Sequence, residues 1–140
     1  MAPRSASETR RSVEASIVRL GRSISDARDA VATREGVTPI GAALLLAVRE
    51  PRPQGVVAEA LGLTEPRLSV LASKLVDRKF VRRRTTRGDK RFRILELTAA
   101  GRRVADRIEQ GHAALDPLGG LSDAQVKQLA RVLAAVTPPD

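Results

Sequence analysis

Basic side chains gather in one part of this sequence. Residues 64–93 contain 11 Lys and Arg against 3 Asp and Glu, a net charge of +8. The whole 140-residue chain has a net charge of +9, so this window holds nearly all of the excess. A bias in composition would spread the charge, whereas a local cluster is typical of a surface that faces a polyanion. A merely solvated basic face is the alternative.

The residue types that enzymes and metal sites need are scarce. The chain has no Cys and a single His, His112, which argues against thiol chemistry and zinc sites. Asp106 and Glu109 stand among several arginines, a pattern typical of a solvated helix face with i,i+4 ion pairs. Since no phosphate loop or catalytic triad is visible either, we expect no enzyme activity, metal or cofactor.

Length and hydropathy indicate one globular domain with no membrane partner. The chain is 42% hydrophobic and 29% charged, and its length suits a single core. Its longest uncharged run, residues 36–48, has 13 residues, whereas a membrane span needs about 20. Arginines interrupt the early apolar stretches, so we expect no signal peptide and a cytoplasmic protein.

Periodic apolar residues predict helices at both ends of the chain. The spacing predicts a long helix over residues 7–33, after a loose terminus of about five residues, and a last helix after a capping box at Ser122 and Gln125. Such narrow seams suit helix-to-helix packing, so we expect a partner subunit to cover them. The expected dimerisation residues are Val13, Ile17, Leu20, Ile24, Leu129, Val132, Leu133 and Val136.

Four further helices are expected between these ends. Thr38 predicts the start of a buried helix that is apolar nearly all round, and Thr98 caps another after the basic window. Between them, a short helix ends at Gly62 in a left-handed conformation, and Thr64 caps the next with Glu65 in its first turn. The three-residue junction has helix-turn-helix geometry, with a generic helical hairpin as the alternative.

A basic hairpin follows the helix-turn-helix. Val81–Arg84 and Arg91–Leu97 are typical of two strands joined by a turn. The only aromatic residues, Phe80 and Phe92, flank this ribbon, and we expect them to pack rather than to stack on bases. The fold class is therefore mainly α with a small β-hairpin wing. It comprises an N-terminal dimerisation helix (1–36), a winged helix-turn-helix core (37–97) and C-terminal dimerisation helices (98–140).

Four segments carry a known pattern in this order and spacing: residues 57–64, 75–83, 89–91 and 97–101. Together they resemble the MarR family of bacterial transcriptional regulators. The resemblance extends over roughly residues 38–136. The resemblance implies a homodimer whose winged helices bind a palindromic DNA duplex. It also implies a small-molecule effector, because such molecules release many members from DNA. No ligand-binding residue can be assigned from the sequence.

The chain departs from the family pattern at four places. Gly41-Ala42 replace a frequent Gln-aromatic pair, and Pro53 replaces a helix-capping residue. Lys79 stands where a Gly usually precedes the wing, and a positive φ there would cost about 1 kcal/mol. Val70 stands where an Arg is frequent, which bears on base specificity.

The recognition helix and the wing supply the candidate DNA contacts. Arg67 is the first candidate for base readout, since a guanidinium pairs bidentately with guanine. Arg87, in the hairpin turn, is placed to enter the minor groove. Asp89 and Arg91 either form an ion pair that braces the wing, or Asp89 only fills a turn position. The candidate set is Thr64, Pro66, Arg67, Ser69, Val70, Lys74, Arg83, Arg87, Lys90 and Arg91.

The sequence therefore predicts a sequence-specific, double-stranded DNA-binding transcriptional regulator. We expect a homodimeric repressor that binds a palindromic promoter site and that a small-molecule ligand releases. Activation instead of repression stays open. The alternative is an architectural DNA-binding protein without sequence preference or ligand control. The scarcity of aromatic residues argues against RNA or single-strand binding, which relies on stacking.

Overall fold

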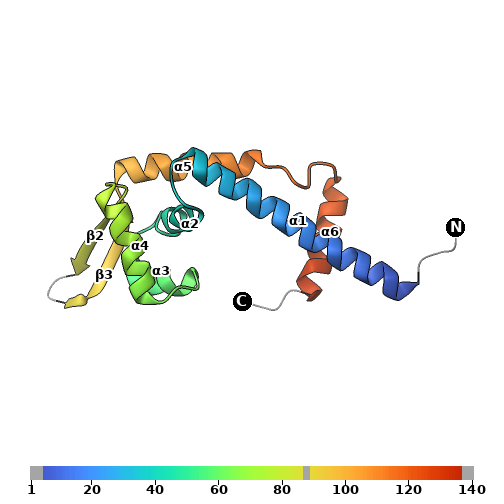
Figure 1. The fold of residues 1–140 in the computed structure, drawn as a ribbon, viewed down its shortest axis with the longest axis horizontal. Coiled ribbons are helices and arrows are strands. Elements are labelled where there is room, and N and C mark those ends of the chain that lie inside the picture. The colour runs from blue at the N-terminus through green and yellow to red at the C-terminus, as the bar shows by residue number, and fades with distance from the viewer. Residues whose placement is uncertain (1–4, 87–88, 137–140) are drawn as a thin grey trace.

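The computed structural model describes residues 5–86 and 89–136. Figure 1 shows an elongated molecule, with the hairpin and α2–α4 at one end and α6 and the first half of α1 at the other. The elements are α1 (Ala6–Arg34), α2 (Pro39–Ala47), β1 (Arg52–Pro53), α3 (Gln54–Ala60), α4 (Glu65–Asp77), β2 (Val81–Thr86), β3 (Asp89–Leu97), α5 (Ala99–Ala114) and α6 (Asp123–Val136).

Side-chain caps begin three helices where the sequence predicts them. The Thr38 hydroxyl accepts a hydrogen bond from the Gly41 amide at 3.1 Å, and Thr98 accepts one from the Gly101 amide at 3.0 Å. Before α6, the Ser122 hydroxyl and the Gln125 side chain each bond the other residue's backbone amide, which confirms the predicted capping box. Each cap satisfies an amide that the first helical turn leaves unpaired.

One expectation about helix starts is wrong, and a second holds only in part. Ser5 is not part of a loose terminus, because it forms a capping box with Glu8, whose amide lies 3.2 Å from the Ser5 hydroxyl oxygen. The motif is a serine followed three residues later by a glutamate, so it was readable in the sequence. Thr64 is the N-cap residue of α4, but its side chain makes no capping bond.

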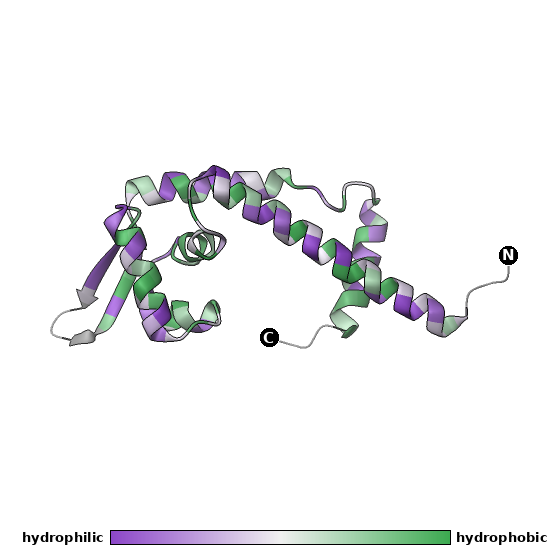
Figure 2. Cartoon of the chain, in the orientation of Figure 1, coloured by the Kyte–Doolittle hydropathy of each residue, from purple (hydrophilic) through white to green (hydrophobic). Residues whose placement is uncertain are grey.

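The core lies where α2 packs against α1, α3, α4 and α5. Leu44 and Leu45 of α2 are fully buried at its centre, and Figure 2 shows α2 as a hydrophobic helix. The prediction that α2 is a buried helix holds for its centre, whereas Pro39 and Ile40 in its first turn are exposed. The remaining core residues are Val31, Ala32, Val37, Ala42, Val48, Val57, Ala58, Leu68, Ala72, Leu75, Val81, Leu95, Leu97, Val104, Ala105 and Ile108.

The wing is a three-stranded antiparallel sheet in the order β1-β3-β2, not the two-stranded ribbon that the sequence predicts. Arg52 and Pro53 pair with Leu95 and Ile94 of β3. Proline is rare within sheets, because it has no backbone amide to donate. An edge strand tolerates it, because the missing amide is not needed there. The sheet joins the wing to the segment before α3.

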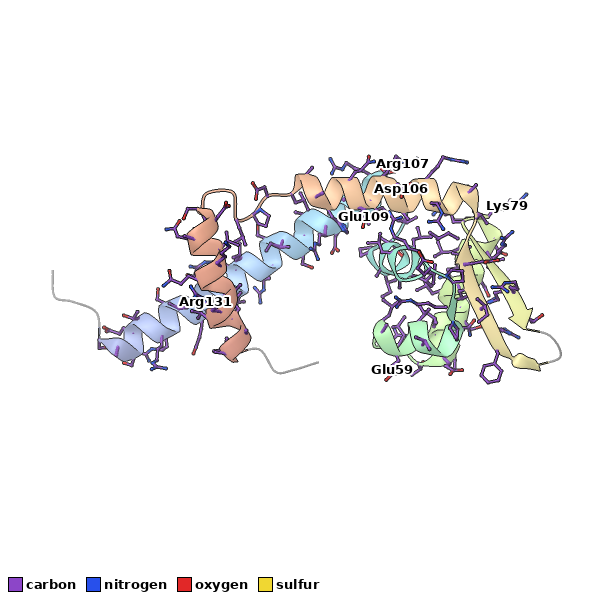
Figure 3. The ribbon with its side chains drawn as sticks, turned by 180° about the vertical axis from the view of Figure 1, so that it is seen from behind. Glu59, Lys79, Asp106, Arg107, Glu109 and Arg131 are labelled. Carbon is purple, nitrogen blue, oxygen red and sulfur yellow. The ribbon has the colours of Figure 1, made fainter. Side chains whose placement is uncertain are left out.

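Ion pairs between helices replace the expected i,i+4 pairs along α5. Arg49, just after α2, lies 2.7 Å from Asp106 and 2.6 Å from Glu109, and Figure 3 shows both carboxylates on α5. Arg107 pairs with Glu35 after α1 at 2.6 Å. The pKa of the Arg49 guanidinium is raised, chiefly by its hydrogen bond to Asp106, although burial acts to lower it. These pairs connect α5 to the ends of α1 and α2.

A tight joint connects α4, β2 and α5. Lys79, between α4 and β2, has a φ of 61°, so the positive φ that its position suggested is confirmed. The Thr98 hydroxyl donates to the Lys79 carbonyl oxygen at 2.6 Å. Gly101 lies so close that a Cβ there would overlap the Phe80 carbonyl oxygen. The start of α5 is therefore fixed against the beginning of the wing.

Candidate nucleic-acid interface

The outward face of α4 carries four of the ten residues predicted to contact DNA. Leu68, Ala72 and Leu75 are buried and form its inner stripe. This leaves one exposed stripe on the opposite side of the helix. Its residues are Pro66, Arg67, Val70 and Lys74. Gly62, with a φ of 64°, makes the turn from α3 into α4, so the left-handed glycine that the sequence predicts is confirmed.

The arginines of β2 point to two sides of the wing, as alternation along a strand requires. Arg82 and Arg84 share one carboxylate, Glu96 of β3, with Nε to Oε1 distances of 2.7 and 3.7 Å. Arg83 points the other way, towards α4. The three arginines therefore do not share one face of the wing. Figure 2 shows β2 as a largely hydrophilic strand.

Arg83 forms a bridge from the wing to α4. Its Nη1 donates to the Ser73 hydroxyl at 2.9 Å, and its Nη2 donates to the Ser69 carbonyl oxygen at 2.7 Å. Burial, and then the nearby charge of Arg93, lower the pKa of the Arg83 guanidinium, whereas Asp77 raises it. An arginine stays charged through such shifts. The predicted DNA contact by Arg83 stays a prediction, and the structure adds a bracing contact.

A cleft of about 780 Å³ separates the first half of α4 from the wing. The Ser69 side chain lines it on α4, and Phe92 and Arg93 line it on β3. Phe92 is 56% exposed, so the expectation that it packs rather than stacks is not supported. The acidic side chains of Glu59 on α3 and Glu65 on α4 also line it. The basic side of the cleft therefore belongs to the wing.

Arg93 is a candidate that sequence reasoning missed. It is exposed in the cleft and close enough to Arg83 to lower the pKa of that residue. The signal was available, because alternation from the apolar Leu95 places residue 93 on the side of the sheet that faces α4. Leu95 is fully buried. An exposed cation beside the recognition helix is suited to a phosphate contact.

Several predicted wing contacts lie outside the described structure. Arg87 falls between the two described ranges, and so does the glycine of the turn. The side chains of Asp89, Lys90 and Arg91 are likewise outside what the structure describes. The ion pair that would brace the wing and the minor-groove contact therefore stay predictions. Strands β2 and β3 reach further towards the tip than expected, to Thr86 and Asp89.

The predicted dimerisation residues form apolar surfaces at the far end of the molecule. On α1, Val13, Ile17 and Leu20 are 52%, 49% and 40% exposed. On α6, Val132 is 56% exposed and Val136 is 70% exposed, and this helix has no buried residue. Figure 1 shows α6 and the first half of α1 well away from the hairpin. Side chains of this kind are costly to leave in water, so these surfaces suit a protein partner.

A second cavity, of about 580 Å³, lies between α1, α2 and α5. Its lining includes Arg28 and Asp29 of α1, Ala42 of α2 and His112 of α5. The departure at Gly41-Ala42 places small, buried residues on α2 near this space. A Cβ at Gly41 would lie 3.0 Å from the Thr38 hydroxyl oxygen, so a larger residue there would crowd the helix cap.

Within residues 5–86 and 89–136, no group of three or more His, Cys, Asp or Glu residues is arranged to hold a metal ion. Across the same ranges, no helix has both the length and the apolar character that a membrane crossing requires.

A family model bears on the identity of the winged helix. The model described as MarR family matches residues 35–91, the segment from the end of α1 into the wing. Residues 35–91 are therefore similar to the MarR family. Among curated proteins, none matches the sequence.

Solved structures extend the MarR fold to the whole chain. AbsC, a MarR family transcriptional regulator from Streptomyces coelicolor, is 17% identical and has a TM-score of 0.78 over 96% of this chain and 95% of its own. The YusO protein from Bacillus subtilis is 20% identical, with a TM-score of 0.77 over 95% and 97%. Sco3205, a MarR family regulator from S. coelicolor solved in complex with DNA, is 25% identical, with a TM-score of 0.74 over 96% and 89%. The predicted fold class is confirmed.

Proposed function

We propose that this protein is a MarR-family transcriptional regulator that binds double-stranded DNA sequence-specifically. The observation that carries the proposal is the exposed stripe of α4, where Arg67 and Lys74 stand beside a basic wing. A helix of this size enters the major groove, and the flanking cations meet the backbone phosphates. The DNA complex of Sco3205, with the same fold, supports the proposal. A cytoplasmic location accords with this function.

The proposed active form is a homodimer in which residues 1–36 and 98–140 assemble around a partner copy. The support is the exposed apolar surface of α1 and α6. Two winged helices related by a twofold axis match two half-sites of a palindrome. Bound at a promoter, such a dimer would exclude the transcription machinery, so repression is the proposed outcome.

Ligand control is the third part of the proposal. The cavity beside Arg28 and His112 has a volume within the usual range for small-molecule sites. It also lies between the proposed dimerisation helices and the winged helix, so a ligand there could alter how they pack. Benzoate, a simple aromatic anion, is a suitable probe. If the cavity is a binding site, saturating benzoate raises the melting temperature and weakens DNA binding together.

Selection from a random duplex library tests the proposal against an architectural role. A regulator enriches one palindrome and binds it at least about 10³-fold more tightly than random DNA. An architectural protein binds all duplexes within a few fold. The bound fraction also has to fall steeply with salt, because phosphate contacts release counterions. Equal affinity for the selected and the random duplex would overturn the proposal.

A further inference from the structure

Val70 is an exposed valine in the middle of the recognition helix. It is 59% exposed, and the inner stripe of α4 is complete without it. Its exposed neighbours one turn away are Pro66, Arg67 and Lys74. With Pro66 and Arg67 it lines an open hollow of about 310 Å³ on the outer surface of α4. An apolar spot thus sits between two cations.

The folded chain gains little from a valine at this position. A β-branched residue has lower helix propensity than alanine or a long polar residue. Its exposed methyl groups also stay in water. A valine here contributes free energy when a binding partner covers its methyl groups. The partner has to be apolar at this spot and anionic on both sides, since Arg67 and Lys74 flank the valine.

Duplex DNA offers one apolar group in its major groove, the 5-methyl group of thymine. The other base edges in that groove present hydrogen-bond donors and acceptors, which a valine cannot satisfy. We propose that Val70 contacts a thymine methyl in each half-site and makes the protein select thymine at that position. This proposal rests on the proposed function, because it names what the recognition helix recognises.

The spacing on α4 places this thymine relative to the base that Arg67 contacts. Residues three apart on a helix lie on the same side and about 4.5 Å apart along the axis. Base pairs are stacked about 3.4 Å apart. The thymine is therefore one or two base pairs from a guanine, with which the Arg67 guanidinium pairs. The selected half-site should contain the two bases at this spacing.

Deoxyuridine provides the test, because it differs from thymidine only in lacking the 5-methyl group. The probes are the duplex selected by the full-length protein and copies in which each thymine is replaced in turn by deoxyuridine. At one position per half-site, the replacement should weaken binding by about fourfold, the value expected for one buried methyl group. Fluorescence anisotropy at fixed salt measures the dissociation constants.

Val70→Ala separates a methyl contact from a general loss of binding. The variant should bind the thymine duplex more weakly and bind the thymine and deoxyuridine duplexes equally. It should stay folded, since alanine is the better helix former. Val18→Ala on α1, where the valine is 53% exposed, is the matched control and should keep the wild-type ratio.

Three results would overturn this inference while leaving the proposed function standing: a selected site without thymine at this spacing, no effect of deoxyuridine at any position, or an unchanged ratio in Val70→Ala. A wild-type protein that binds every duplex equally would instead overturn the proposed function, and this inference with it.

Discussion

Nη2 of Arg83 on β2 donates a hydrogen bond to the carbonyl oxygen of Ser69 on α4, 2.7 Å away. The same guanidinium bonds the Ser73 hydroxyl one turn further along the helix at 2.9 Å. One side chain thereby holds the wing at a fixed distance from the recognition helix. In the proposed complex, these two elements occupy neighbouring grooves of the duplex. Arg83 is accordingly a positioning residue for DNA binding as well as a candidate contact.

Replacing Arg83 distinguishes these two roles. We expect Arg83→Met to lower the free energy of unfolding by about 1–2 kcal/mol, because it removes hydrogen bonds from a charged donor. We also expect weaker DNA binding with an unchanged slope of log K against log[salt]. If Arg83 itself contacts phosphate, the slope falls by about 1.8 for the two copies in a dimer. Urea denaturation and anisotropy at several salt concentrations measure both quantities. Arg83→Lys should keep part of the affinity.

Arg67 and Arg87 should differ in what their removal does. Arg67 is exposed on α4, where its guanidinium can pair with guanine, so Arg67→Ala should cost about 1–3 kcal/mol on the selected duplex and relax specificity at one position. Arg87→Ala, in the turn that the sequence predicts, should weaken binding to all duplexes more evenly. Competition against a panel of point-substituted duplexes measures the pattern. Equal losses on every duplex for both variants would contradict this division.

The fold was largely predictable because its signals are local. Periodic apolar residues and caps such as Ser122 identify the helices, and Gly62 identifies the turn into α4. What the sequence did not reveal depends on contacts between distant segments. Nothing local to Arg52 shows that it pairs with Leu95, and nothing local to Arg49 shows that it bonds two carboxylates on α5.

In the candidate interface too, local signals were predictable from the sequence and contacts between distant segments were not. The exposed stripe of α4 was predictable from helical periodicity, because the buried leucines fix which side faces out. The bridge from Arg83 to Ser69 was not, since it depends on the distance between the wing and α4. Arg93 could have been found, because alternation from Leu95 already gave its side of the sheet. Phe92 was misassigned because composition alone says nothing about a side chain near a strand end.

Lys79→Gly should stabilise the protein. Lys79 has a φ of 61°, a conformation that costs a residue with a Cβ about 1 kcal/mol relative to glycine. Glycine also gains entropy in the unfolded chain, which offsets part of the strain that is relieved. We therefore expect the free energy of unfolding to rise by about 0.5–1 kcal/mol. Asp77→Gly, two residues earlier in α4, is the control and should lower it. A loss of stability in Lys79→Gly would contradict the strain argument.

Gly101→Ala should disrupt the joint between the wing and α5. The added Cβ would overlap the Phe80 carbonyl oxygen, a backbone atom that cannot turn aside. We expect a loss of about 2–3 kcal/mol in the free energy of unfolding. Gly120→Ala is the matched control, because nothing lies within 4 Å of a Cβ at that position, and its effect should stay within about 0.5 kcal/mol. Thermal denaturation of both variants measures the difference.

Ile17→Glu should abolish dimerisation without unfolding the protomer. Ile17 is 49% exposed on α1, so a glutamate is tolerated in the free chain but would bury a charge in the proposed interface. Sedimentation should show a monomer, with helical content retained by circular dichroism. DNA affinity should fall by at least about 100-fold, because the two half-sites are no longer bound together.

Ala15→Glu adds the same charge to the same helix and is the control. Residue 15 is exposed and lies on the side of α1 opposite Ile17, Leu20 and Ile24. This variant should remain a dimer and keep its DNA affinity. If Ile17→Glu stays dimeric while its fold is intact, the seam on α1 is not the interface. The apolar face of α6, with Val132 and Val136 exposed, would then have to hold the dimer alone.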